Sequence, residues 1–386
     1  MDRRTLKNLD FLFILFTFLL LVASLIILST ASINVMKSNP LHYVKTQTMW
    51  IIIGIGIAAI LAVIDYEKWR TYRWWIYGFN LLLLLAVVFF GDAAKGATRW
   101  IPTPFGFNIQ PSEFAKIFII MTLADFLAVR KGKLNNFTDF IMPFLFVLVP
   151  MLLIFKQPDL GTTLVFVAIF IGMMFVAGAN PWKFGGLILG GAVLMGIALW
   201  LHFSTTLPGW LHWAQGLPLP MHEYQLKRLT IFMDPAADMS GDGYHIIQSI
   251  WAIGSGGLWG KGYQMGTQGQ LNFLPEHHTD FIFSVVGEEF GFIGTITLLF
   301  LFLIFLLRSL SIALKARDTY GMLIATGVVS MFTFHLLVNV GMTSGIMPVT
   351  GIPLPLISAG GSAMLANLAA VGLMLSINLR RQRLMF

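Results

Sequence analysis

Cysteine is absent from the 386-residue sequence, which excludes disulfide bonds, a thiolate nucleophile and cysteine-ligated metal sites. Charged residues are also scarce: they make up 11% of the chain, whereas hydrophobic residues make up 57%. So few polar side chains cannot cover a soluble globule of this length. The P-loop motif and the dinucleotide fingerprint are missing as well. These absences predict an integral membrane protein that brings no nucleotide-driven chemistry of its own.

Long apolar runs dominate what is present. A helix needs about 20 residues to cross the hydrocarbon core of a bilayer, and ten runs of near that length are separated by polar or Pro/Gly-rich breaks. We therefore expect an all-α integral membrane protein in which residues 1–386 form one domain with ten transmembrane helices. The expected helices cover residues 11–30, 47–64, 74–90, 112–129, 138–155, 161–177, 184–201, 281–307, 320–340 and 356–377.

The placement of Lys and Arg predicts the orientation of the chain. The formal net charge is +7, but the basic residues lie in short groups between apolar runs, which indicates topology and argues against nucleic-acid binding. Sixteen Lys and Arg fall on the side of the N-terminus and eight on the opposite side, although the loops there are longer. Because cytoplasmic loops are enriched in Lys and Arg, both termini should be cytoplasmic. One large loop, residues 202–280, should then lie outside, between the seventh and eighth helices.

Polar motifs gather at the outer side, where the even-numbered helices begin. These motifs are Gln110-Pro111-Ser112-Glu113, Gln157-Pro158-Asp159, Glu276-His277-His278-Thr279-Asp280 and residues 355–361. The N-terminus of a helix has unsatisfied N–H groups and the positive end of the helix dipole, so it favours anions. For Pro111, Ser112 and Pro158, ordinary helix capping is the alternative explanation.

Lys116 lies about one turn inside the fourth helix, where a cation costs several kcal/mol unless it is paired or hydrated. Glu113, three residues earlier, is its nearest candidate partner. Arg99, Gln157 and Asp159 are expected on the same side of the membrane, which favours a functional role for Lys116. Its alternative is a side chain that extends to the outer interface.

Asp280 ends a charged cluster and precedes an apolar run, so it should lie at the edge of the bilayer. A partly desolvated carboxylate there suits a general base, and an N-cap of the eighth helix is the alternative. Glu288 and Glu289 fall two turns deeper, where pairing with Lys or Arg is expected and a place in the cavity is the alternative. His277 and His278 are adjacent on the chain and lack the spacing of a zinc site, so a weak divalent-cation site made of carboxylates and substrate phosphates is favoured over zinc.

The residues alone therefore predict an outward-facing cleft in the membrane, lined by cations and helix N-termini and with one exposed carboxylate beside it. Such a cleft suits an anionic lipid or solute that carries phosphate. A lipid-phosphate transferase and a transporter fit this description equally well.

The segment from Gly266 to Phe283, with Leu-Pro-Glu-His-His-Thr-Asp at its centre, closely resembles the SEDS family (shape, elongation, division, sporulation) of bacterial cell-wall polymerases. The resemblance covers nearly the whole chain. It extends over Gln110 to Glu113, Gln157 to Gly161 and Ser358 to Ser362. The paired histidines and the short tails are most similar to the RodA branch, with the division branch FtsW and its sporulation relative as runners-up.

The resemblance implies a peptidoglycan glycosyltransferase of the bacterial cytoplasmic membrane that polymerises lipid II at the outer face during cell elongation. It implies a class B penicillin-binding protein as the partner, Asp280 as the base, and inversion with an undecaprenyl diphosphate leaving group. No tightly bound cofactor is expected, and Mg²⁺ or Mn²⁺ could assist. Lipid II flipping is the competing function. The substrate-binding candidates are Lys116, Arg99, Lys227, Arg228, Gln110, Glu113, Gln157, Asp159, Glu276, His278 and Ser358.

Overall fold

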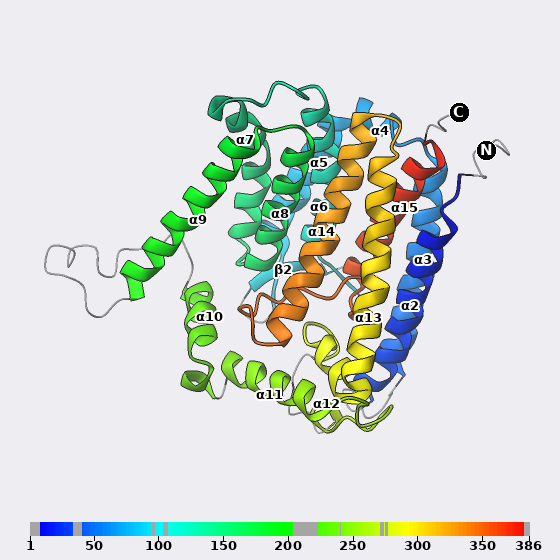
Figure 1. Cartoon of the computed structure of the whole chain (residues 1–386), viewed down its shortest axis with the longest axis vertical. Coiled ribbons are helices and arrows are strands. Elements are labelled where there is room, and N and C mark those ends of the chain that lie inside the picture. The colour runs from blue at the N-terminus through cyan, green and yellow to red at the C-terminus, as the bar shows by residue number, and fades with distance from the viewer. Residues whose placement is uncertain are drawn as a thin grey trace, which may run out of the picture.

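The computed structural model describes residues 8–33, 41–94, 97–102, 107–203, 223–239, 241–270, 274 and 277–381. These residues are mostly helical, and the long helices form one bundle (Figure 1). The long helices are α2 (Phe11–Ala31), α3 (His42–Val63), α5 (Arg73–Phe90), α6 (Pro111–Ala128), α7 (Phe137–Phe155), α8 (Leu160–Val176), α9 (Pro181–Phe203), α13 (Ile282–Leu314), α14 (Thr319–Thr343) and α15 (Gly361–Leu379).

Each apolar run in the sequence coincides with one of these helices. The largest difference in position is the end of α13, which continues to Leu314 and not only to residue 307. Within the described residues, eight of the helices are long and apolar enough to cross a membrane. The other two are α8, which has 17 residues, and α6, which contains Glu113, Lys116 and Asp125.

The chain also contains short elements, among them a small sheet that the sequence did not predict. A three-stranded antiparallel sheet, in the order β1 (Asp92–Ala94), β2 (Ala97–Pro102) and β3 (Asn108–Ile109), connects α5 to α6. Strands this short show no clear alternation of polar and apolar residues, so the expectation of an entirely helical chain was wrong here. The remaining short helices are α4 (Lys68–Thr71), α10 (Glu223–Met233), η2 (Pro235–Asp238), α11 (Asp242–Ser255) and α12 (Thr267–Gln270).

The two ends of the bundle contain different parts of the chain. Asn378 Nδ2 donates to the Asn8 carbonyl at 2.8 Å, and Asn8 Nδ2 donates to the Leu379 carbonyl at 3.2 Å. The described ends of the chain therefore lie together, at the end of the bundle where Figure 1 marks both termini. Helices α10, α11 and α12 lie at the opposite end (Figure 1).

Helices α14 and α15 form the centre of the bundle. In their most apolar stretches, 67% of the residues of α14 and 78% of those of α15 are buried, compared with 6% in α9. Figure 1 accordingly shows α9 leaning away from the other helices. Since exposed apolar residues on a membrane helix face lipid, the arrangement makes α9 a peripheral helix and α14 and α15 the scaffold of the interior.

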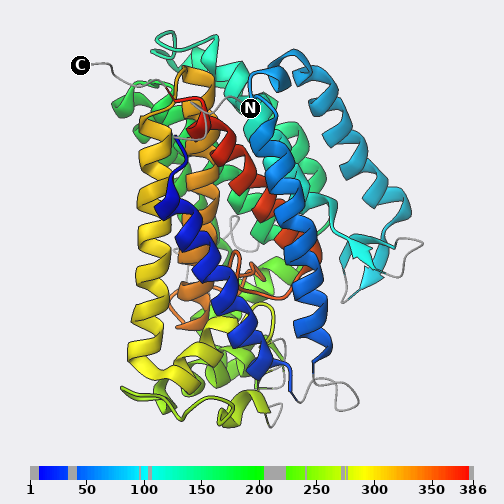
Figure 2. The ribbon, with the colours of Figure 1, turned by 90° about the vertical axis from the view of Figure 1, so that its right-hand side faces the viewer.

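Small residues allow α3 and α15 to approach closely, and Figure 2 shows the two helices (blue and red) crossing. A Cβ atom added to Gly372 of α15 would lie 2.7 Å from the Cα atom and the carbonyl oxygen of Ala58 in α3. One added to Gly54 of α3 would lie 2.4 Å from Leu368 Cδ1. Because lipid supplies little driving force for helix association, such close backbone contact is a main source of packing energy.

We expect Gly372→Ala to lower the free energy of unfolding by about 1–3 kcal/mol, because the added methyl group overpacks a contact with backbone atoms. The matched control is Gly186→Ala in α9, where an added Cβ atom meets nothing within 4 Å. The control should be neutral or slightly stabilising. Thermal unfolding of the purified proteins in detergent measures both, and equal midpoints for the two variants would contradict the close packing.

The backbone of α13 breaks at Gly291, which has φ 63° and ψ −160°. The chain that follows α11 fills the break: Phe292 N donates to the Gly257 carbonyl at 2.9 Å, and Lys261 N donates to the Glu288 carbonyl at 3.0 Å. Lys261 Nζ also lies 2.6 Å from Glu288 Oε1, so the expected pairing of this buried carboxylate is confirmed. These contacts hold the outer loop against the start of α13.

Candidate active site

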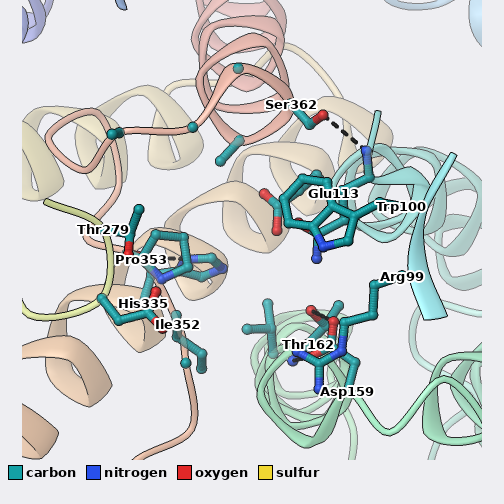
Figure 3. Close-up of a pocket in the computed structure, with 18 of the residues that line it drawn as sticks. Arg99, Trp100, Glu113, Asp159, Thr162, Thr279, His335, Ile352, Pro353 and Ser362 are labelled. Carbon is teal, nitrogen blue, oxygen red and sulfur yellow. Dashed lines mark hydrogen bonds and ion pairs between the residues drawn. The ribbon is translucent and has the colours of Figure 1, made fainter. Parts of the chain in front are cut away.

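A cavity of about 450 Å³ lies where the N-terminal ends of α6, α8 and α15 meet (Figure 3). Its volume is in the range of small-molecule and cofactor sites. Six of the residues predicted from the sequence line it together, from five different parts of the chain. They are Arg99, Gln110, Glu113, Asp159, Arg228 and Asp280.

The local sequence explains why these helices begin at the cavity. Pro111 occupies the first turn of α6, where its missing N–H is harmless. Asp159 is the N-cap of α8, and Gly360 precedes the first residue of α15. Gln110 N donates to Ser362 Oγ at 2.9 Å, which ties the start of α6 to the start of α15 (Figure 3). Three helix N-termini thus surround the cavity, and each favours negative charge nearby.

Arg99 is fixed on one wall of the cavity by the start of α8 (Figure 3). Its Nε donates to the Gln157 carbonyl at 3.3 Å, another of its nitrogens donates to the Pro158 carbonyl, and its Nη1 lies 3.8 Å from Asp159 Oδ1. Asp159 also accepts from Thr162 N at 3.1 Å and from Thr162 Oγ1 at 2.9 Å. Asp159 therefore caps α8 and lines the cavity at the same time, and Arg99 presents a cation that is held in place.

Glu113 faces the cavity from α6, and Lys116 lies behind it. Lys116 Nζ is 2.9 Å from both carboxylate oxygens of Glu113 and 3.2 Å from His335 Nε2. The predicted pairing of Glu113 with Lys116 is confirmed. The side chain of Lys116 is only 1% exposed, so it is a buried cation and does not extend to the interface. Lys116 itself is behind the cavity wall, and it contacts Glu113 and His335, which both line the cavity.

Asp280 lies in the turn just before α13. The N-cap residue of α13 is Phe281, so Asp280 is not the cap that the alternative explanation required. Asn339 Nδ2 in α14 donates at 2.8 Å to the Asp280 carbonyl and at 2.8 Å to the Ile352 carbonyl. Ser358 Oγ donates to the Thr279 carbonyl at 2.6 Å. The backbone that carries Asp280 is thus fixed from two sides.

Arg228 brings the outer loop to the same cavity. Its Nη1 donates to the Val349 carbonyl at 2.9 Å. A Cβ atom added to Gly351 would lie 3.4 Å from Asp280 Oδ2 and 3.7 Å from Arg228 Nη1. Since Gly351 has a φ of 73°, a side chain there would be strained, and its Cβ atom would contact both the carboxylate and the guanidinium.

Five predicted residues do not line the cavity themselves. Besides Lys116 they are Gln157, whose Nε2 donates to the Leu84 carbonyl at 3.0 Å; Lys227, 62% exposed and 3.1 Å from Asp238; His278, whose ring centroid is 4.6 Å from that of Tyr43; and Ser358, which holds Thr279. Direct substrate contact by these residues stays a prediction. Glu276 lies outside the described residues.

Several lining residues were not predicted. His335 lines the cavity, and Asn339 behind it holds the Asp280 carbonyl. Both are polar residues in the apolar run of α14, and such residues are rare enough in membrane helices to be a usable signal. His335 Nδ1 lies 3.3 Å from the Pro353 carbonyl, which ties α14 to the segment before α15. Trp100 and Asn108 also line the cavity. They lie on the short sheet, and the sequence carried no signal for it.

A metal site is not preformed in the part of the chain that the structure describes, because no group of three or more His, Cys, Asp or Glu could hold an ion there. His277 Nδ1 lies 2.5 Å from the Leu274 carbonyl. The rings of His277 and His278 are inclined by 81° to one another. The two histidines therefore have separate surroundings, as their adjacency on the chain predicts.

Comparison with known proteins places the chain in a family. Residues 9–383 match the family of cell cycle proteins that includes FtsW, RodA and SpoVE. The sequence is 38% identical over 377 residues to the peptidoglycan glycosyltransferase MrdB of Escherichia coli, with 95% of this chain and 94% of that protein covered. It is 37% identical to the peptidoglycan glycosyltransferase RodA of Treponema pallidum, covering 88% and 90%. It is also 37% identical to a probable peptidoglycan glycosyltransferase FtsW of Trichlorobacter lovleyi, covering 92% and 89%.

Solved structures have the same fold. A chain of a peptidoglycan synthase complex that coordinates polymerisation and crosslinking superposes with a TM-score of 0.77 at 30% identity, covering 96% of this chain and 98% of that one. The rod shape determining protein RodA of Thermus thermophilus superposes with a TM-score of 0.69 at 27% identity, covering 97% and 98%.

Proposed function

The chain belongs to the FtsW, RodA and SpoVE family, the SEDS family, and from this premise we propose that its cavity polymerises lipid II at the outer face of the cytoplasmic membrane. The protein is a multi-pass membrane protein and a peptidoglycan glycosyltransferase, as its relatives are named. The observation that carries the proposal is that Asp280, Arg99 and Arg228 line one cavity beside three helix N-termini.

In the proposed reaction, Asp280 takes the proton from the 4-hydroxyl group of the acceptor sugar. The oxygen attacks the anomeric carbon of the donor, the bond from that carbon to the diphosphate breaks, and the configuration inverts. A single base suffices because a diphosphate leaves as a stable anion and needs no acid from the protein. Asp280 suits the role because its backbone is fixed by Asn339 and its neighbour Thr279 by Ser358, so little reorganisation is required.

Arg99 and Arg228 are the proposed stabilisers of the departing diphosphate. Their guanidinium groups can each form two parallel hydrogen bonds to phosphate oxygens. The N-termini of α6, α8 and α15 add fixed positive dipole ends. Charge that develops on the leaving oxygen would then meet donors already in place, which is the most effective form of electrostatic catalysis.

A divalent cation is a proposed assistant to this reaction. The described residues contain no group of three acidic or histidine side chains that could hold an ion, so the diphosphate of the substrate would supply most of the oxygen ligands that Mg²⁺ prefers, beside a single carboxylate of the cavity wall. Such an ion would neutralise part of the charge of the diphosphate. The chemistry of Asp280 does not depend on it.

The proposed partner is a class B penicillin-binding protein, which crosslinks the new glycan. The similarity to a chain of a peptidoglycan synthase complex supports this. We further propose a role in cell elongation, which the similarity to RodA and MrdB supports.

We also propose that residues 1–386 form one membrane domain with ten spanning helices, both termini in the cytoplasm and residues 202–280 outside. The described ends of the chain lie at the end of the bundle away from α10 and α11, which is consistent with an even number of crossings.

The topology can be tested with single cysteines, because the chain has none of its own. In right-side-out membrane vesicles, an impermeant maleimide should label Met233→Cys, whose native side chain is exposed at the end of α10. Lys133→Cys, in the connection between α6 and α7, should be labelled only after the vesicles are permeabilised. The reverse pattern would overturn the orientation.

A further inference from the structure

A second cavity, of about 360 Å³, lies between α5, α6 and α7. It is at the opposite end of α6 from the active-site cavity: Glu113 lines the active-site cavity, whereas Thr122, Phe126 and Arg130 line this one. The proposed reaction uses none of its residues. Its place in the bundle puts it on the side of the chain termini, where α5 begins and α6 ends.

The mouth of this cavity carries net positive charge. Asp125 has a fully buried side chain, and it accepts from Arg70 Nε at 2.5 Å and from Arg73 as well. Two guanidinium groups therefore share one carboxylate. Arg130 donates to the Phe126 carbonyl at 3.1 Å and lies 3.7 Å above the ring of Phe126. Among the described residues no carboxylate lies within ion-pair distance of Arg130, so the group as a whole has two more positive than negative charges.

The interior of the cavity is apolar. Thr122 lies six residues before the end of α6 at Ala128, which corresponds to ~9 Å along the helix. Its hydroxyl is used within the helix, donating to the Phe118 carbonyl at 2.8 Å. Phe126 and Phe146 stack with ring centroids 4.8 Å apart. Trp74 lies at the rim and is 59% exposed, as is common for Trp at a membrane interface.

We propose that this cavity binds an anionic phospholipid from the leaflet on the side of the chain termini. Arg73 and Arg130 would hold the phosphate, and the upper part of an acyl chain would lie against Phe126 and Phe146. The charge of the mouth complements an anionic headgroup and not a zwitterionic one. The apolar interior of the cavity can bind acyl chains, which a free phosphate compound does not have.

The test is native mass spectrometry of the purified, detergent-solubilised chain titrated with phosphatidylglycerol or with phosphatidylcholine of the same acyl chains. We expect the wild type to retain phosphatidylglycerol at concentrations at least tenfold lower. Arg130→Gln should weaken this binding about fivefold or more, since one basic residue near a lipid surface contributes about 1 kcal/mol. Lys133→Gln is the matched control. It removes the same charge from the same connection, at a residue that does not line the cavity, and should bind as the wild type does.

Three results would overturn the proposal. The first is equal retention of the two lipids by the wild type, a comparison that needs no variant and holds even if Arg130→Gln fails to fold. The second is an equal loss of phosphatidylglycerol binding in Arg130→Gln and Lys133→Gln, which would mean that general surface charge holds the lipid. The third is displacement of the lipid by an equal concentration of sn-glycerol 3-phosphate, which would mean a site for free phosphate compounds.

Discussion

Asp280→Asn should lower the initial rate of glycan polymerisation from lipid II by about 10²–10⁴-fold, the usual contribution of a positioned general base. Asparagine has nearly the same shape as aspartate but cannot take the proton of the acceptor hydroxyl. The backbone contacts of Asn339 to Asp280 and of Ser358 to Thr279 involve carbonyl groups, so they remain in the variant. The loss should therefore be in the rate, with little change in the thermal unfolding midpoint.

The matched control for this measurement is Asp238→Asn. Asp238 is also a carboxylate of the outer loop, but it pairs with the exposed Lys227 at 3.1 Å and does not line the cavity. The control should keep a rate within about twofold of wild type, as exposed ion pairs contribute little. Near-normal polymerisation by Asp280→Asn would contradict the role as a base. Lipid II movement across vesicle membranes, if it occurred and survived in this variant, would point to flipping as a separate function.

The sequence predicted best those features that depend on residues close together in the chain. The length of an apolar run determines whether it can cross a bilayer, so each expected helix has a counterpart in the structure. Residues three apart on a helix are neighbours, so Glu113 could be named as the partner of Lys116. Asp159 accepts a hydrogen bond from Thr162, three residues later, at the start of α8, which is again a contact within one short segment. These features needed no knowledge of which helices touch.

Features that depend on packing could not be predicted in this way. A lone His335 in an apolar run signals a polar partner but does not say that the partner is Lys116, 219 residues away in the chain. The contact of Arg228 with Val349 needs the outer loop to fold back over the segment before α15. Likewise Ser358 was predicted to bind substrate, and only the three-dimensional arrangement shows its hydroxyl holding Thr279.

The burial of Lys116 changes how its contribution should be tested. It was predicted to bind substrate, yet its ammonium lies between the carboxylate of Glu113 and the ring of His335. Removing it leaves Glu113 buried without its cation, and breaking a buried pair typically costs about 3–5 kcal/mol. The charge of the cavity wall would then change.

Lys116→Met should therefore reduce the initial polymerisation rate by roughly 10²-fold or more, as loss of a preorganised charge usually does, and should lower the thermal unfolding midpoint. Lys227→Met is the matched control, because it removes the same charge from an exposed residue of the outer loop, and it should have almost no effect. Lys116→Arg should recover part of the rate at best, since a planar guanidinium cannot replace an ammonium that contacts both oxygens of Glu113 and a ring nitrogen of His335.

The double variant Glu113→Gln/Lys116→Met separates activity from stability. It removes both charges of the buried pair, so its unfolding midpoint should recover most of what Lys116→Met loses. Its polymerisation rate should stay low, because the cavity wall has lost the ion pair that shapes its charge. Rates are compared at saturating lipid II, with partner-bound protein and well below the lowest midpoint. A wild-type rate in Lys116→Met would mean that the buried pair serves only the fold, and it would leave Arg99 and Arg228 as the cations that act on the diphosphate.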